Sequence, residues 1–176
     1  DADSALTVGA VDTLRNVAGF SSYGPTSDGR IKPNVAAVGR SAVVANTSTG
    51  LPSYGSGTSF ACPNMAGITT CLWQAFPEIS NMGIINALQE SGDKSNNPDD
   101  RTGYGVPDVK KAFVILQKNT ASTSAVFNAC HVTVDLSIKT DSTMQVTLER
   151  RLSDENNYTI IHAFSSNENY GMNHLD

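Results

Sequence analysis

The sequence lacks the features that mark several classes of protein. Its 176 residues contain only three cysteines and three histidines, in no spacing typical of a zinc site. Like charges form no block, so no basic stripe predicts nucleic-acid binding, and no apolar run approaches the length of a membrane span. A hydrophobic fraction of 39% and a net charge of −5 are typical of an ordinary folded chain. The length allows one domain, or one domain with a small partner.

The few cysteines give little support for a disulfide framework. Cys62 and Cys71 fall in one predicted helix, where nine positions separate them by about 13.5 Å, beyond the roughly 7 Å between the Cα atoms of a disulfide. A pair between Cys71 and Cys130 stays open. We expect three buried free thiols, because free cysteine is commonly a small core residue.

The first part of the chain alternates strand-like and helix-like patterns. Short apolar runs at 5–11, 33–39 and 41–45 are typical of strands, and the first predicts a buried strand of a parallel sheet. A loop predicted at 46–57, rich in Ser, Thr and Gly, follows them.

Three helices are predicted after this loop. The first runs from 59 to 76 and carries an apolar stripe of Met65, Ile68, Leu72 and Phe76, extended by Trp73. Pro63 is expected in its first turn, where a missing N–H costs nothing. The second helix begins at an N-cap, Ser80, and ends at Gly92, and the third runs from Pro107 to about Lys118.

The composition changes after Lys118. A polar linker at 119–124 precedes alternating strands at 132–138 and 144–148, which predict a hairpin, and a third strand is expected at 158–164. The chain beyond 165 is polar, and we expect no regular structure there.

Ser59 stands where a glycine-rich turn enters the first predicted helix. The string Gly57-Thr58-Ser59-Phe60-Ala61-Cys62-Pro63 has two interpretations. The serine caps the helix, or it is a nucleophile beside first-turn N–H groups that are free to stabilise an oxyanion. A bare Gly-Thr-Ser favours the cap. The longer string, continued by Met65-Ala66-Gly67, resembles the active-serine signature of subtilisin-like serine peptidases, the subtilase family.

Other stretches resemble elements of the same family, in the same order along residues 5–116. They are Val8 to Asp12, Phe20 to Pro25, Asp28 to Gly39, and Gly103 to Asp108. Asn34 and Val38 replace the family's usual Asp and Pro, and Asn64 stands where His is frequent. That histidine is not part of the family's triad, so its absence leaves the resemblance intact.

The resemblance implies that Ser59 is the catalytic nucleophile. Its backbone N–H would be one oxyanion donor, with Thr58 in support. In this family an aspartate and a histidine precede the serine, yet no histidine precedes Ser59 here, and Asp3, Asp12 and Asp28 lie in no triad-like motif. We therefore expect the chain to be the C-terminal piece of a longer serine endopeptidase, with catalytic Asp, His and oxyanion Asn upstream. Alone, it is expected to be inactive.

The predicted fold is α/β. Residues 1–118 form an incomplete subtilisin-like parallel-sheet core with helices, and 119–176 form a linker, a small antiparallel β segment and a polar tail. The resemblance implies a protein or peptide substrate and a secreted, periplasmic or cell-surface location. Partners expected are the missing N-terminal part and further copies of this chain. No cofactor is predicted: the family often binds calcium, but Asn96 to Asp100 is better explained as a solvated loop.

Two alternatives stay open. His131, His162 and His174 all follow Ser59, an order that α/β-hydrolase esterases use with a Gly-x-Ser-x-Gly turn. Against this, Ala61 stands at the last glycine position, two of the histidines fall in strand-like stretches and the third in the polar tail. The other alternative is a non-catalytic pseudopeptidase or binding module whose C-terminal sheet is the working part.

Overall fold

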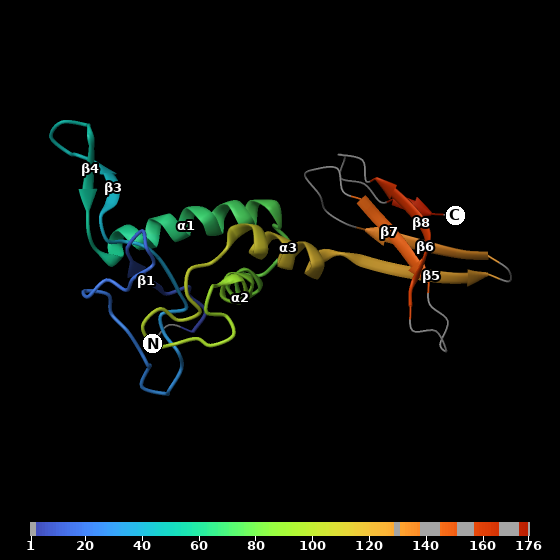
Figure 1. Ribbon diagram of the computed structural model, residues 1–176, viewed down its shortest axis with the longest axis horizontal. Coiled ribbons are helices and arrows are strands. Elements are labelled where there is room, and N and C mark those ends of the chain that lie inside the picture. Colours follow the sequence, from blue (N-terminus) through green and yellow to red (C-terminus); the bar gives the residue numbers. More distant parts are fainter. Residues whose placement is uncertain (1–2, 129–130, 138–144, 151–156, 166–172, 176) are drawn as a thin grey trace. The chain divides into compact units, whose positions relative to one another are not determined.

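Figure 1 shows the chain as a computed structural model with two units, residues 1–116 and 117–176. The structure describes residues 3–128, 131–137, 145–150, 157–165 and 173–175. The predicted division into domains at 118/119 stays a prediction. Within the described residues, no helix is long and apolar enough to cross a membrane.

A parallel pair of strands lies at the centre of the first unit. β1 (Val8–Val11) pairs with β2 (Val35–Val38) in a register that runs from Val8↔Val35 to Val11↔Val38. Most residues of both strands are buried, as expected for a parallel pair that is covered rather than solvated. The prediction of buried, parallel strands is confirmed, and the sheet has two strands in the described part of the chain.

A β-hairpin follows. β3 (Ala42–Ala45) pairs antiparallel with β4 (Pro52–Gly55). The sequence predicted a loop over all of 46–57, and this was wrong for β4. Proline, serine and glycine have low strand propensity, so the local sequence did not indicate a strand, and pairing with β3 decides its conformation.

Three helices complete the first unit: α1 (Thr58–Ala75), α2 (Asn81–Ser91) and α3 (Val109–Thr120), the last of which continues into the second unit. The caps predicted for α2 are confirmed, since Ser80 Oγ accepts a 3.2 Å hydrogen bond from Gly83 N and Gly92 is the C-cap. α3 begins two residues after Pro107 because Asp108 acts as its cap, with Oδ1 accepting from Lys111 N at 3.1 Å.

The core of the first unit lies between the parallel pair and the helices. α1 packs on β1 and β2 through Ala61, Met65 and Leu72, and Phe76 meets the ring of Phe113 with centroids 4.9 Å apart. The largest fully buried side chains are Phe76, Met65, Ile84, Leu88, Leu116, Val11 and Val35. The apolar stripe predicted for the first helix is therefore confirmed.

The other face of α1 is open in this chain. Trp73, predicted to extend the stripe, is 43% exposed, so that prediction was wrong. Cys62 and Cys71 are exposed free thiols, not the buried ones expected. Helical periodicity places these side chains away from the stripe, and nothing among the described residues covers them. Cys130 lies outside the described residues, so its pairing with Cys71 stays open.

In its described residues, the second unit contains two antiparallel sheets. Their strands are β5 (Ser122–Asn128), β6 (His131–Ser137), β7 (Gln145–Arg150), β8 (Thr159–Ser165) and β9 (Asn173–Leu175). β6 pairs with β5 and β9, and β7 pairs with β8. The hairpin predicted between 132–138 and 144–148 is wrong, because alternation identifies a strand but not its partner.

Two further corrections concern the ends of this unit. The predicted linker at 119–124 is instead the end of α3 and the start of β5, with only Ala121 between them. Residues 173–175, expected to lack regular structure, form β9 against β6. Both segments are polar, so their composition does not indicate a strand. Pairing with β6 determines their conformation.

Candidate active site

The turn that delivers Ser59 is fixed by close backbone packing. Gly57 N donates a 2.8 Å hydrogen bond to the carbonyl oxygen of Gly39, just beyond β2. A Cβ atom on Gly39 would lie 2.7 Å from Gly57 O, 2.9 Å from Ala10 Cβ and 3.0 Å from Ala61 Cβ. Only glycine allows this approach, which holds the start of α1 against the end of the parallel sheet.

A second close contact supports the turn from the hairpin side. The ring of Phe60 lies over Gly55, where an added Cβ would be 2.7 Å from the ring. Phe60 N also donates to Gly57 O at 3.1 Å. The side chain that follows Ser59 thereby anchors α1 to the end of β4.

Ser59 itself is exposed in the first turn of α1. The N-cap is Gly57, no side chain caps the helix, and no acidic side chain occupies the first turn. The interpretation of Ser59 as a cap is therefore wrong. Ser59 Oγ has no hydrogen-bond partner among the described residues and lies 3.1 Å from the point where a Cβ on Gly57 would stand. The backbone N–H of Ser59 has no intrahelical acceptor, so it can donate a hydrogen bond to an incoming oxygen.

Thr58 precedes Ser59 in the same turn and is partly exposed. Its hydroxyl also has no hydrogen-bond partner within the part of the chain that the structure describes. Both site residues predicted from the sequence thus lie side by side in the helix start with free hydroxyl groups.

The next turn of α1 contains Pro63 and Asn64, and Asn64 attaches the site to the sheet. Pro63 lies in the second turn, not the first as predicted, because α1 already begins at Thr58. Without an N–H, Pro63 cannot donate to the carbonyl oxygen of Ser59 four residues earlier. Asn64 Nδ2 donates to Val38 O at 3.0 Å, at the end of β2. The sequence did not predict these roles of Asn64 and Gly39, which depend on residues distant in the chain.

The aspartates before Ser59 bind other groups. Asp12 accepts hydrogen bonds from the backbone and side chain of Asn16, which lower the pKa of its carboxyl group. Asp28 accepts from the Thr26 hydroxyl, which lowers its pKa. Asp3 pairs with Arg30. Within the described part of the chain, therefore, none of these three aspartates forms a triad with Ser59.

Comparisons with known proteins agree with this geometry. A sequence profile of the subtilase family matches residues 1–105. The chain belongs to the subtilase family. Subtilisin-like protease SBT6.1 of Arabidopsis thaliana is 35% identical to this subtilase over 130 residues, 66% of the chain. Subtilisin DY of Bacillus licheniformis is 34% identical over 103 residues, 58% of the chain.

A solved structure supports the fold of this subtilase. The self-cleaved protease domain of PatA superposes with a TM-score of 0.53 at 26% identity, over 65% of this chain and 42% of that chain. The predicted α/β fold with an incomplete core sheet is thereby confirmed. The chain spans 12% of SBT6.1 and 34% of subtilisin DY.

The loop considered for calcium in this subtilase has internal partners for its central carboxylate. Asp99 accepts hydrogen bonds from Lys94 Nζ and from the backbone N–H groups of Arg101 and Thr102. Burial alone would raise the pKa of Asp99, but these bonds outweigh it and lower the pKa to about 2. Among the described residues, no group of three or more His, Cys, Asp or Glu side chains is placed so that it could hold a metal ion.

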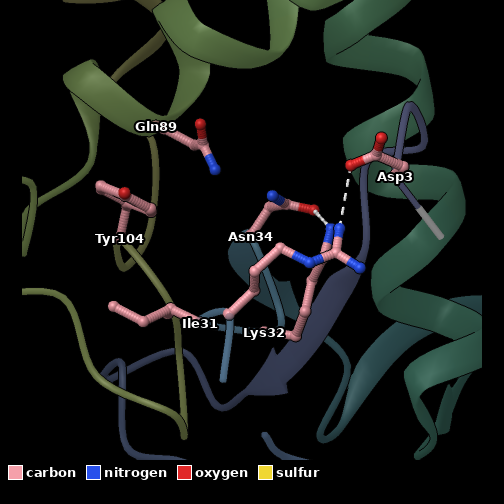
Figure 2. Close-up of a pocket in the computed structure, with 7 residues that line it drawn as sticks. Asp3, Ile31, Lys32, Asn34, Gln89 and Tyr104 are labelled. Carbon is pink, nitrogen blue, oxygen red and sulfur yellow. Dashed lines mark hydrogen bonds and ion pairs between the residues drawn. The ribbon is translucent and has the colours of Figure 1, made fainter. Parts of the chain in front are cut away.

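A pocket of about 270 Å³ has Asp3, Lys32, Asn34 and Tyr104 among its lining residues (Figure 2), and Ser59 is not one of them. Arg30 Nη1 pairs with Asp3 Oδ1 at 2.9 Å, and Lys32 Nζ donates to Asn34 Oδ1 at 2.8 Å. Burial and the nearby charge of Arg30 lower the pKa of Lys32. Both cationic side chains of the pocket therefore have partners within the chain.

Proposed function

We propose that this chain carries the nucleophile of a serine endopeptidase, with Ser59 as the catalytic residue. The observation that carries the proposal is an exposed serine hydroxyl without a hydrogen-bond partner among the described residues, in an uncapped first helical turn. Membership of the subtilase family supports it. The comparisons favour neither the esterase nor the non-catalytic alternative.

In the proposed reaction, Ser59 Oγ attacks the carbonyl carbon of a peptide bond. A serine hydroxyl is a weak nucleophile and needs a base, so a histidine oriented by an aspartate, both outside this chain, accepts its proton. The Ser59 backbone N–H donates to the tetrahedral oxyanion, and Thr58 assists. The amine then leaves, and water hydrolyses the acyl-enzyme. Loss of one oxyanion donor typically lowers turnover about 10²–10³-fold.

The same proposal includes a partner and a location. The exposed face of α1 and the two-stranded sheet would be covered by the rest of the peptidase domain or, in the isolated chain, by further copies. An extracellular location, secreted, periplasmic or on the cell surface, is proposed from the family resemblance. The substrate is a protein or peptide.

A fluorophosphonate probe, which reacts with activated serines, tests the proposal in the full-length protein. We expect rapid labelling and peptide hydrolysis, both abolished by Ser59→Ala. The matched control is Ser56→Ala, because Ser56 Oγ is bonded to Ser41 N at 3.0 Å and lies only three residues away. It should leave the labelling rate within about twofold, since surface substitutions away from the chemistry usually have small effects.

Two outcomes would contradict the proposal. Hydrolysis that persists in Ser59→Ala would exclude Ser59 as the nucleophile. Loss of activity on substitution of His131, His162 or His174 would favour a base after the serine, as in an esterase. The isolated 176-residue chain should label far more slowly than the full-length protein, because Ser59 lacks its base.

A further inference from the structure

The turn of the β3–β4 hairpin contains the triplet Asn46-Thr47-Ser48. Asn-x-Ser/Thr, with x other than proline, is the acceptor sequence for N-linked oligosaccharides. Such triplets arise often by chance, so the triplet alone indicates little. The position and the hydrogen bonding of Asn46 decide whether its amide can serve as an acceptor.

Asn46 lies at the end of the hairpin that is farther from Ser59. It follows Ala45, which pairs with Pro52, whereas Ser59 lies beyond Gly55 at the other end of β4. Figure 1 shows the hairpin projecting from the start of α1, with its turn outermost. Residues 47–50 are all exposed. A large group attached here would extend into solvent without contacting the serine turn.

The side-chain amide of Asn46 is fixed by hydrogen bonds to its oxygen, whereas its nitrogen makes none among the described residues. Oδ1 accepts hydrogen bonds from Ser48 N at 2.9 Å and Thr49 N at 3.0 Å. Nδ2 has no partner among the described residues, and none of their buried side-chain polar atoms is unsatisfied, so Nδ2 is accessible to solvent. The two N–H donors also polarise the amide, which favours loss of a proton from Nδ2.

This conformation is built entirely within residues 46–51. Asn46 N donates to Leu51 O at 2.9 Å, and Gly50 N donates to Asn46 O at 2.8 Å. Gly50 has a φ of 71°, a value that glycine adopts without cost. The hydrogen bonds that hold the Asn46 amide therefore depend on no contact outside the hairpin.

We propose that Asn46 is a site of N-linked glycosylation. The donor is an oligosaccharide linked to a polyprenyl pyrophosphate. Asn46 Nδ2 attacks the anomeric carbon of the first sugar, the bond from that carbon to the phosphate oxygen breaks, and an N-glycosidic bond forms. The polyprenyl pyrophosphate leaves, and a base of the transferase takes the Nδ2 proton. The proposal rests on the extracellular location that is part of the proposed function, because an exported chain passes the enzymes that attach such oligosaccharides.

The experiment uses the full-length protein produced in the secretory pathway of a eukaryotic cell. Treatment with peptide N-glycosidase, followed by mass spectrometry of the peptide that contains Asn46, should show loss of a glycan and conversion of Asn46 to aspartate. Asn46→Asp keeps an oxygen acceptor for both backbone N–H groups but has no amide nitrogen, so it should fold and lack the glycan. Ser48→Ala should also lack it, and Ser48→Thr should keep it.

The triplet Asn157-Tyr158-Thr159 in the second unit supplies the matched control. Asn157→Asp should leave the glycan on Asn46 in place. An unmodified Asn46 amide in the wild-type protein would overturn the proposal. So would a glycan that is still found in Asn46→Asp on the peptide that contains position 46. Fluorophosphonate labelling is read in parallel. A labelled but unglycosylated protein contradicts only the glycan, and a glycosylated but unlabelled protein contradicts only the peptidase proposal.

Discussion

Gly39 and Gly57 are joined by a 2.8 Å hydrogen bond from Gly57 N to Gly39 O. It connects the residue after β2 to the residue before α1, eighteen positions later in the chain. The contact places Ser59 at the end of the parallel pair. The geometry of the site therefore depends on the absence of a side chain at position 39 as much as on the serine.

Gly39→Ala should disrupt this contact. The new methyl group would lie 3.0 Å or less from Gly57 O, Ala10 Cβ and Ala61 Cβ, so the backbone must shift. We expect the free energy of unfolding to fall by about 1–3 kcal/mol, the usual cost of overpacking. Urea denaturation of the 176-residue chain measures it.

Gly67→Ala is the control for this prediction. Gly67 lies on the exposed side of α1, and a Cβ there meets nothing within 4 Å. Because alanine favours a helix more than glycine, the variant should be more stable by up to about 1 kcal/mol. Equal effects of the two substitutions would contradict the role assigned to Gly39.

Asn34→Ala should destabilise the connection between the start of the chain and β2. Asn34 is buried, and its Oδ1 accepts from Thr7 N at 2.9 Å, Thr7 Oγ1 at 2.8 Å and Lys32 Nζ at 2.8 Å. Removing this acceptor leaves three donors unpaired, so we expect a loss of about 2 kcal/mol in unfolding free energy. Asn34→Asp keeps the acceptor and should lose much less. A denaturation midpoint for Asn34→Ala equal to wild type would contradict the prediction.

The Asp99 carboxylate predicts a pH dependence of stability. Its pKa falls from 3.8 to about 2 on folding, so its stabilising effect is fully present above about pH 4 and is lost as the pH falls to 2. Asp99→Asn should be less stable than wild type at pH 7, and the difference should shrink between pH 4 and 2. The pair with Lys94 is partly exposed, so added salt should reduce the difference too. Asp100→Asn is the matched control, because it removes a neighbouring carboxylate that accepts none of these hydrogen bonds.

The open face of α1 predicts self-association of the isolated chain. Trp73 is 43% exposed, and the same helix carries two further exposed side chains, Cys62 and Cys71. Trp73→Lys should shift the mass seen in sedimentation toward the monomer, because a charge opposes burial of that face. Tyr54→Lys is the control, since Tyr54 is 77% exposed but lies on the hairpin. A strictly monomeric wild-type chain that unfolds cooperatively would contradict this prediction.

Local patterns predicted the first unit well, because the burial of a strand or a helix face is visible in the spacing of its own apolar residues. The apolar runs of β1 and β2 and the stripe of α1 are buried as expected, and Ser80 caps α2 through its own side chain. The second unit was predicted less well. Alternation located β6 and β7, but it carried no information on partners, so the pairing of β6 with β5 and β9 was missed.

The sequence by itself determined the family, the α/β class and the identity of the candidate nucleophile, because the string around Ser59 and its flanking elements are contiguous and specific. Only the tertiary structure decided that Ser59 does not cap its helix, that Gly39 and Asn64 hold the turn, and that Cys62, Cys71 and Trp73 face outward. The physical reason is separation along the chain. A hydrogen bond across eighteen residues, or an uncovered helix face, depends on which segments meet after folding.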